Sequence, residues 1–199
     1  MPLTGTAGET DRGSGRQYRL DDRGTTMKVL VAYASRHGAT AGIAERIAEV
    51  IRTEGHTADT VELPAATSVD DYDACVVGSS AYLGHWEKAA SAFVREHRDG
   101  LVARPVWLFT SGPLGTEEVD EQGQNVRESA APRELPELTD AIAPREHHVF
   151  FGALDPKTLG VGARVMRKLP AGRKVLPEGD FRDWPEIEDW ARSIVRALA

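Results

Sequence analysis

Cysteine is nearly absent from the sequence, because Cys75 is the one cysteine among 199 residues. A single thiol excludes a disulfide framework and a cluster of thiolate metal ligands within the chain, and it fits a reducing, cytoplasmic location. Cys75 lies among apolar neighbours in a predicted strand, so we expect an inert packing residue. Long apolar runs are also absent, and residues 1–26 lack the apolar core of a signal peptide. We therefore expect neither a membrane span nor a leader.

The sequence also has fewer positive than negative side chains. The chain has 24 Lys and Arg against 31 Asp and Glu, which gives a net charge of −7. Most of such a surface would repel a phosphate polymer, so we expect no nucleic-acid partner. Residues 155–176 are the exception, because six cations stand there against one acid. That segment carries +5, which leaves −12 for everything else.

The first 26 residues have almost nothing to bury, being rich in Gly, Thr and charged side chains. We expect them to form a disordered extension, followed by one folded domain over residues 27–199. Met27 would be either the natural start or the start of this domain. With 41% hydrophobic residues, the chain is long enough for one well-buried α/β domain and too short for two ordinary ones.

Apolar runs alternate with helical stripes along the rest of the chain. We expect strands at about 28–34, 57–62, 73–79, 105–110 and 147–153. Apolar spacing predicts helices that end near Gly55 and that cover about 86–97, about 134–143 and the C-terminal residues, the last with Asp183 and Glu186 as a capping box. This alternation predicts a doubly wound parallel sheet with helices on both faces.

In a doubly wound sheet a ligand binds beyond the carboxyl ends of the strands, where the strand order reverses. Three loops follow the relevant strands: SRHGAT at 35–40, SSAYLGHW at 79–86 and TSGPLG at 110–115. The first loop precedes a helix N-terminus, whose free N–H groups and dipole favour an anion, and Ser35 and Thr40 add hydroxyl groups. The sequence therefore predicts a phosphate site.

The residues missing from the first loop narrow the choice of phosphate ligand. No lysine precedes Thr40 and no second glycine accompanies Gly38, which argues against a Walker A loop and a nucleoside triphosphate. A dinucleotide fingerprint would need three spaced glycines. A response-regulator receiver would need acids where Ser35 and Ser79 stand. A monophosphate ligand remains.

Together the three loops resemble those of flavodoxins, over about residues 28–199. Within that superfamily the sequence is similar to the menaquinone-dependent protoporphyrinogen IX dehydrogenase group. The similarity lies in Ser35-Arg36 before Gly38-x-Thr40, in the stretch Tyr82–Trp86, and in Phe150–Pro156 leading to a basic segment. His37 and Ala39 replace the hydroxyl residue and asparagine usual in electron-carrier flavodoxins, which favours the dehydrogenase-like group.

The resemblance implies a flavodoxin-like doubly wound five-stranded parallel sheet of order 2-1-3-4-5, with FMN as the cofactor. It places the phosphate at residues 35–40 and the isoalloxazine at 80–86 and 110–114. The implied cofactor-binding residues are Ser35, Arg36, His37, Gly38, Ala39, Thr40, Ser80, Ala81, Tyr82, Leu83, Gly84, His85, Trp86, Thr110, Ser111, Gly112, Pro113 and Leu114.

Individual side chains carry further expectations. We expect Tyr82 or Trp86 to stack on the flavin ring, and His37 and His85 to be hydrogen-bond partners within their loops. No residue stands out as catalytic. His147 and His148 alternate across a strand and cannot bind one metal ion together, so we expect no metal site.

Three functions remain open. The first is an FMN oxidoreductase that passes electrons from a reduced substrate to a quinone, with porphyrinogen as substrate implied only by the resemblance. The second is a carrier whose acidic surface docks on a basic redox partner protein. The third is a flavin-binding module without turnover.

The basic segment bears on this choice. A helix over 161–169 would place Arg164, Arg167 and Lys168 opposite an apolar side formed by Val161, Val165, Met166 and Leu169. Its basic face would meet either an anionic substrate or the lipid surface, which would make the protein peripheral to the inner face of the membrane. The structural alternative is an amphipathic helix packed on the domain with solvated arginines.

Overall fold

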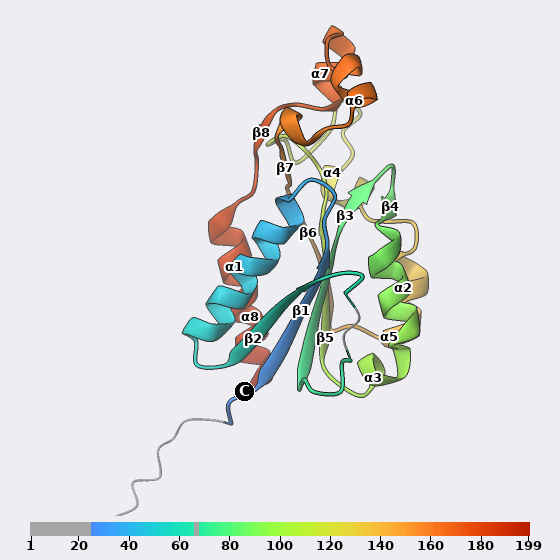
Figure 1. Ribbon diagram of the computed structural model, residues 1–199. Coiled ribbons are helices and arrows are strands. Elements are labelled where there is room, and N and C mark those ends of the chain that lie inside the picture. The colour runs from blue at the N-terminus through green and yellow to red at the C-terminus, as the bar shows by residue number, and fades with distance from the viewer. Residues whose placement is uncertain (1–24, 66–67) are drawn as a thin grey trace, which may run out of the picture.

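Five parallel strands form the centre of the fold in the computed structural model, which describes residues 25–65 and 68–199 (Figure 1). The strand order is β2-β1-β3-β5-β6, which confirms the predicted order 2-1-3-4-5. The strands are β1 (Lys28–Ala34), β2 (Thr57–Glu62), β3 (Ala74–Tyr82), β5 (Val106–Ser111) and β6 (Glu146–Phe150). The expected N-terminal extension lies outside the described residues, apart from its last two.

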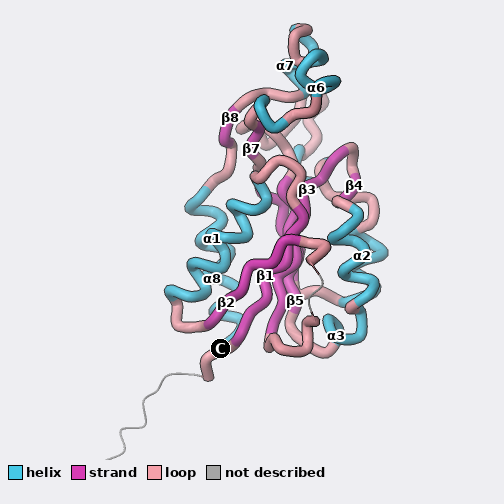
Figure 2. Tube along the Cα trace, viewed as in Figure 1, coloured by secondary structure: helices cyan, strands magenta, loops and turns pink. Residues whose placement is uncertain are grey.

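Helices cover both faces of the sheet (Figures 1 and 2). One face carries α1 (Ala39–Thr53) and α8 (Trp184–Leu198), and the other carries α2 (Lys88–Glu96), α3 (Arg98–Val102) and α5 (Leu135–Ile142). Alternate residues of β1 enter the two cores, with Val29 and Val31 on the α1–α8 side and Leu30 and Ala32 on the other. This two-sided burial explains the unbroken apolar run of β1. None of the described helices is long and apolar enough to cross a bilayer.

Helix α8 begins where the sequence predicts, but its cap differs in part. The Asp183 side chain accepts a hydrogen bond from the Glu186 backbone N–H at 3.1 Å. The Glu186 side chain does not complete the expected capping box. It instead accepts hydrogen bonds from Arg127 Nη1 at 2.6 Å and from His148 Nε2 at 2.8 Å. The helix start therefore also ties α4 (Val126–Ser129) to β6.

The strand predicted over 147–153 ends earlier, at Phe150. Its continuation leaves the sheet because the Gly152 N–H donates to the carbonyl of Pro113 at 2.9 Å. Residues Ala153–Leu154 form β7, which pairs antiparallel with β8 (Gly179–Asp180) in a separate two-stranded sheet. We call residues 151–182, which begin where β6 ends, the cap.

The cap contains only short elements (Figure 2). They are β7, the 3-10 turn η1 (Pro156–Thr158), α6 (Val161–Met166), α7 (Pro170–Val175) and β8. The single helix predicted over 161–169 is wrong, because α6 ends at Met166 and Pro170 opens a new helix. The alternative in which its apolar side packs on the domain does not hold for Val161, Val165 and Leu169, which are exposed.

Cys75 lies in β3 and is fully buried in the core on the α2–α5 side. Burial raises the pKa of its thiol to about 12, although Arg104 acts in the opposite direction. The thiol is therefore protonated at neutral pH and packs like an apolar side chain, as its neighbours in the sequence predict.

Candidate functional site

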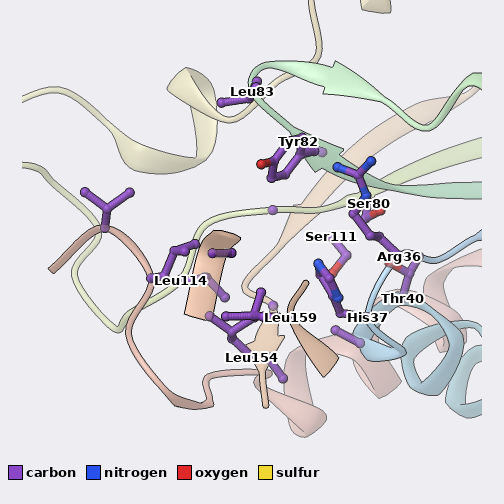
Figure 3. Close-up of a pocket in the computed structure, with 18 of the residues that line it drawn as sticks. Arg36, His37, Thr40, Ser80, Tyr82, Leu83, Ser111, Leu114, Leu154 and Leu159 are labelled. Atoms are coloured by element: carbon purple, nitrogen blue, oxygen red, sulfur yellow. The ribbon is translucent and has the colours of Figure 1, made fainter. Parts of the chain in front are cut away.

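A cavity of about 640 Å³ lies at the carboxyl ends of β1, β3 and β5, between the three predicted loops and the cap (Figure 3). In the close-up, Leu114, Leu154 and Leu159 gather on one side of the cavity, while Arg36, His37 and Thr40 lie on another. The residues lining the cavity are Arg36, His37, Ala39, Thr40, Ser80, Ala81, Tyr82, Leu83, Ser111, Gly112, Leu114, Gly152, Ala153, Leu154, Leu159, Gly160, Ala163, Met166, Val175 and Leu176.

The loop between β1 and α1 leaves the start of the helix open. Ser35 Oγ accepts a hydrogen bond from the Gly38 N–H at 3.0 Å, which closes the turn. Gly38 is the N-cap at φ 86°, a left-handed conformation that costs glycine little. No side chain caps the first turn of α1. Its backbone N–H groups and the positive end of the helix dipole thus remain available to an anion.

Three buried polar atoms at this cavity have no hydrogen-bond partner: His37 Nδ1, Thr40 Oγ1 and Ser80 Oγ. The described residues contain only three other such side-chain atoms, on Ser91, Glu134 and Trp190. A buried polar group without a partner destabilises the folded state, because its hydrogen bonds to water are lost and not replaced. A ligand that forms hydrogen bonds with these three atoms would remove that penalty. The arrangement fits an anionic ligand rich in hydrogen-bonding atoms.

The second loop is a β-hairpin, a form that the sequence reasoning missed. Tyr82 of β3 pairs with His85 of β4 (His85–Trp86), so Leu83 and Gly84 form the turn. Both have positive φ, 54° and 75°, as the two central residues of a type I′ turn require. Leu83 is strained there because its Cβ disfavours the left-handed region. Leu83 is 78% exposed and borders the cavity.

Tyr82 presents its ring to the cavity and is 47% exposed. The Arg36 guanidinium lies over this ring, 4.2 Å from its centroid. Arg36 also pairs with Glu87, with 3.4 Å between Nε and Oε1. A cation–π contact and an ion pair therefore connect the first loop to the second.

Trp86, in contrast, is turned away from the cavity and is only 3% exposed. Its indole Nε1 donates to Thr110 Oγ1 at 2.8 Å, and that hydroxyl is 2.8 Å from His147 Nε2. Burial, with help from neighbouring His148, lowers the pKa of His147 to about 4. Because the indole can only donate, the Thr110 hydroxyl donates to a neutral imidazole. This buried chain supports the cavity wall from behind.

The structure brings eleven of the eighteen predicted residues to the cavity. The others support the loops: His85 Nδ1 is 2.7 Å from Glu134 Oε1, and the carbonyl of Pro113 holds Gly152. Burial raises the pKa of Glu134, but the hydrogen bond with His85 and bonds from backbone N–H groups together outweigh burial, so the pKa is lowered. The residues that do not line the cavity are Ser35, Gly38, Gly84, His85, Trp86, Thr110 and Pro113.

Sequence reasoning placed no cofactor-binding residue in the cap. It gave Arg164, Arg167 and Lys168 of the cap a contact with a substrate or a membrane, and none of the three lines the cavity. Nine of the cavity residues, from Gly152 to Leu176, belong to the cap. The only signal in the sequence is the apolar stripe around Met166, which predicts a packed helix just as well. His147 and His148 lie on opposite faces of β6, as predicted, with His147 on Thr110 and His148 on Glu186. Among the described residues, no group of three or more His, Cys, Asp or Glu is placed to bind a metal ion.

The profile of the flavodoxin domain family matches residues 30–173, which include the three loops and most of the cap. The chain belongs to the flavodoxin domain family. Membership of this family implies FMN binding, which confirms the cofactor that the resemblance of the loops implied.

Protoporphyrinogen IX dehydrogenase [quinone] from Escherichia coli strain K12 is 31% identical to this flavodoxin domain over 86 residues. The match covers 42% of this chain and 48% of the relative, so the chain spans about half the length of that protein.

Two solved structures share the fold. Rubredoxin oxygen:oxidoreductase from Desulfovibrio gigas gives a TM-score of 0.54 at 16% identity, over 86% of this chain and 36% of that one. Oxidised flavodoxin 1 from Bacillus cereus gives 0.51 at 13% identity, over 86% of this chain and 99% of that one. At these identities the likeness shows the fold alone.

Proposed function

We propose that this flavodoxin domain is an FMN-dependent oxidoreductase that delivers electrons to a quinone. The loop at 35–40 holds the FMN phosphate, and Tyr82 with residues 110–114 flanks the isoalloxazine. The observation that carries the proposal is the set of unpaired polar atoms on His37, Thr40 and Ser80 around the open start of α1. Hydrogen bonds to an ionised phosphate are stronger than those between neutral groups, so these atoms favour the phosphate end of FMN.

The remaining residues of the site position and shield the cofactor. Bound FMN supplies the redox chemistry, accepting and donating electrons. Arg36 fixes the Tyr82 ring at the cavity, and the Trp86–Thr110–His147 chain fixes the wall behind it. The uncharged cap residues that line the cavity exclude water on the other side.

The cap also favours an enzyme over a simple carrier. A carrier needs only an exposed flavin edge, whereas here Leu159, Met166 and Leu176 continue the cavity beyond the flavin loops. That wall offers no charged group to a second molecule, so it fits an apolar, planar electron acceptor. The name of the Escherichia coli relative specifies a quinone as acceptor and protoporphyrinogen IX as substrate. We propose the same classes of acceptor and substrate for this chain.

The test begins with the purified full chain. A visible absorption spectrum with identification of the released flavin should show FMN rather than FAD, because one helix N-terminus receives one terminal phosphate. A protein that stays colourless after incubation with FMN would overturn the proposal. With flavin bound, turnover should then be measured with a porphyrinogen as donor and a quinone as acceptor.

The turnover measurement separates the three functions. Continuous quinone reduction by the isolated chain supports the oxidoreductase. Electron transfer that occurs only when a redox partner protein is added indicates a carrier. A flavin that can be reduced but transfers electrons to neither acceptor indicates a binding module.

A further inference from the structure

The tip of the cap, residues 161–175, has an unusual surface. It projects beyond the carboxyl edge of the sheet (Figure 1). Nine large hydrophobic residues are exposed among the described residues, and five of them lie in this tip. Val161, Val165, Leu169 and Val175 are between 57% and 73% exposed. Folded domains rarely expose several aliphatic side chains in one place unless something covers them.

Cations are concentrated in the same tip. Arg164, Arg167, Lys168 and Arg173, with Glu178, line a hollow of about 440 Å³. Arg167 is held in place, because Nε donates to the Leu176 carbonyl at 2.9 Å and Nη2 lies 3.3 Å from Glu178. Arg164 and Lys168 form no ion pair with any described side chain, so their charges remain available. Glu178 offsets only one of these four positive charges, so the cations still repel one another unless a further anion lies between them.

Different faces of helix α6 contact the cavity, the solvent and the basic hollow formed by Arg164, Arg167, Lys168 and Arg173. Ala163 and Met166 line the flavin cavity. Val161 and Val165 face solvent, and Arg164 lies in the basic hollow. The apolar and basic surfaces of the tip are thus adjacent, and both lie next to the wall of the cavity.

We propose that the tip of the cap is a peripheral contact with anionic phospholipid membranes. Headgroup phosphates occupy the basic hollow, while Val161, Val165 and Leu169 enter the boundary of the acyl chains. Neighbouring cations and aliphatic side chains are the two components that such interfacial contacts combine. The −12 carried by the rest of the chain is repelled by an anionic surface, so only the tip approaches it.

A protein partner fits the tip less well. A specific protein interface buries about 800 Å² on each side and usually centres on aromatic anchors. The tip consists of two short helices, and residues 161–175 contain no aromatic residue. Because α6 also walls the cavity, membrane contact would bring the cavity to the phase in which an apolar quinone dissolves. That last step rests on the proposed function, but the lipid contact itself does not.

Flotation of the flavin-loaded full chain with vesicles tests the proposal. Binding should be strong on phosphatidylcholine mixed with phosphatidylglycerol, weak on phosphatidylcholine alone, and reduced by high salt. Changing Arg164→Gln and Lys168→Gln together should lower partitioning about 25-fold, at about fivefold for each cation. The matched control changes Lys88→Gln and Arg196→Gln, two exposed cations outside the cap, and should change partitioning less than twofold.

The aliphatic component needs its own pair of variants. Val161→Ser with Val165→Ser should lower partitioning roughly tenfold. The control is Val102→Ser with Val119→Ser, which are as exposed as Val165 but lie outside the cap. Equal effects of the tip and control pairs, or anionic-vesicle binding that neither tip pair reduces, would overturn the proposal. Loss with the charge pair alone would also overturn it, because the aliphatic residues would then not insert.

Two further readouts keep the alternatives apart. Sedimentation of each variant reports the oligomeric state, and tip variants that dissociate an oligomer without affecting vesicle binding would show that a second copy covers the tip. The flavin spectrum of each variant reports the proposed function. A flavin-loaded protein that ignores anionic vesicles overturns the lipid contact only. A protein that binds them without taking up FMN overturns the proposed function only.

Discussion

The two walls of the cavity, one formed by the three loops and the other by the cap, are stabilised in different ways. The three loops of one wall follow strands whose side chains fill both cores, and Phe109 below them packs against Phe150 and Trp190. The cap wall has little interior of its own, because its buried hydrophobic side chains, among the residues described, are only Phe151, Leu154 and Leu159. One wall is therefore held by the core of the domain and the other by a few links at its base.

Those links are mainly polar. The Gly152 N–H donates to the Pro113 carbonyl at 2.9 Å, and within the base of the cap β7 pairs with β8. Arg182 pairs with Asp180 at 2.6 Å and reaches the Ala39 carbonyl at the start of α1. Because different parts of the molecule stabilise the two walls, a substitution in one wall should leave the other wall intact.

The largest effect should come from the core below the flavin loops. Phe109→Ala removes a fully buried ring and should lower the free energy of unfolding by about 3–5 kcal/mol. Leu169→Ala removes an exposed side chain of the cap and should change it by less than about 0.5 kcal/mol. Urea denaturation measures both, and similar losses in the two variants would contradict the contrast between the walls.

The second effect concerns His147. Its folded-state pKa of about 4 is below the ordinary value of 6.5, so the unfolded chain binds a proton first as the pH falls. This contribution to stability is complete above pH 6.5 and is lost at about 1.4 kcal/mol per pH unit between 6.5 and 4. His147→Gln should remove that part of the slope. Unfolding curves at several pH values would show this, and identical slopes in the two proteins would contradict the burial of a neutral imidazole.

Thr40 and Ser91 provide a matched pair for the third effect. Both carry a buried hydroxyl without a partner, but only Thr40 lines the cavity. Thr40→Val should weaken FMN binding by about 1–3 kcal/mol, because a hydrogen bond to a charged phosphate is lost, without destabilising the flavin-free protein. Ser91→Ala should leave FMN affinity unchanged. Flavin titration followed by fluorescence compares them, and equal affinities for the two variants would remove Thr40 from the phosphate site.

The smallest effect should come from backbone strain. Leu83 and Ala143 both have positive φ, at the hairpin tip and at the end of α5. Leu83→Gly and Ala143→Gly should each stabilise the protein by about 1 kcal/mol, because glycine relieves the left-handed strain. Only Leu83→Gly should also alter the flavin spectrum, since Leu83 borders the cavity. Thermal unfolding with absorption spectra would check this, and unaltered flavin spectra in both variants would make Leu83 a simple turn residue.

The strands that carry the wall formed by the three loops were predicted well from the sequence. The apolar run of β1 and its polar flanks place that strand within 28–34, and the structure gives Lys28–Ala34. The hairpin at Leu83 was missed because Leu is a poor residue for a type I′ turn, so nothing in the local chemistry signals one. Trp86 was offered as a stacking residue, but its N–H needs a buried acceptor, and Thr110 is 24 residues away in the sequence.

The cap was predicted poorly for a different reason. The residues after Phe150 stay apolar, so the alternation gives no sign that the Gly152 N–H turns to Pro113. The helical stripe at 161–169 continues to the residue before Pro170, although the helix has already ended at Met166. Local patterns describe segments that a core holds in place. They describe less well a segment whose apolar residues face a cavity or solvent.

The buried, protonated state of Cys75 makes the wild-type chain suited to site-specific labelling. Thiol reagents such as maleimides react with thiolates, and at neutral pH the one native thiol is inaccessible and almost entirely protonated. A cysteine introduced by Val165→Cys would therefore take up nearly all of a fluorophore without removal of Cys75. A polarity-sensitive dye at that position could report directly, by its emission, when the tip leaves water.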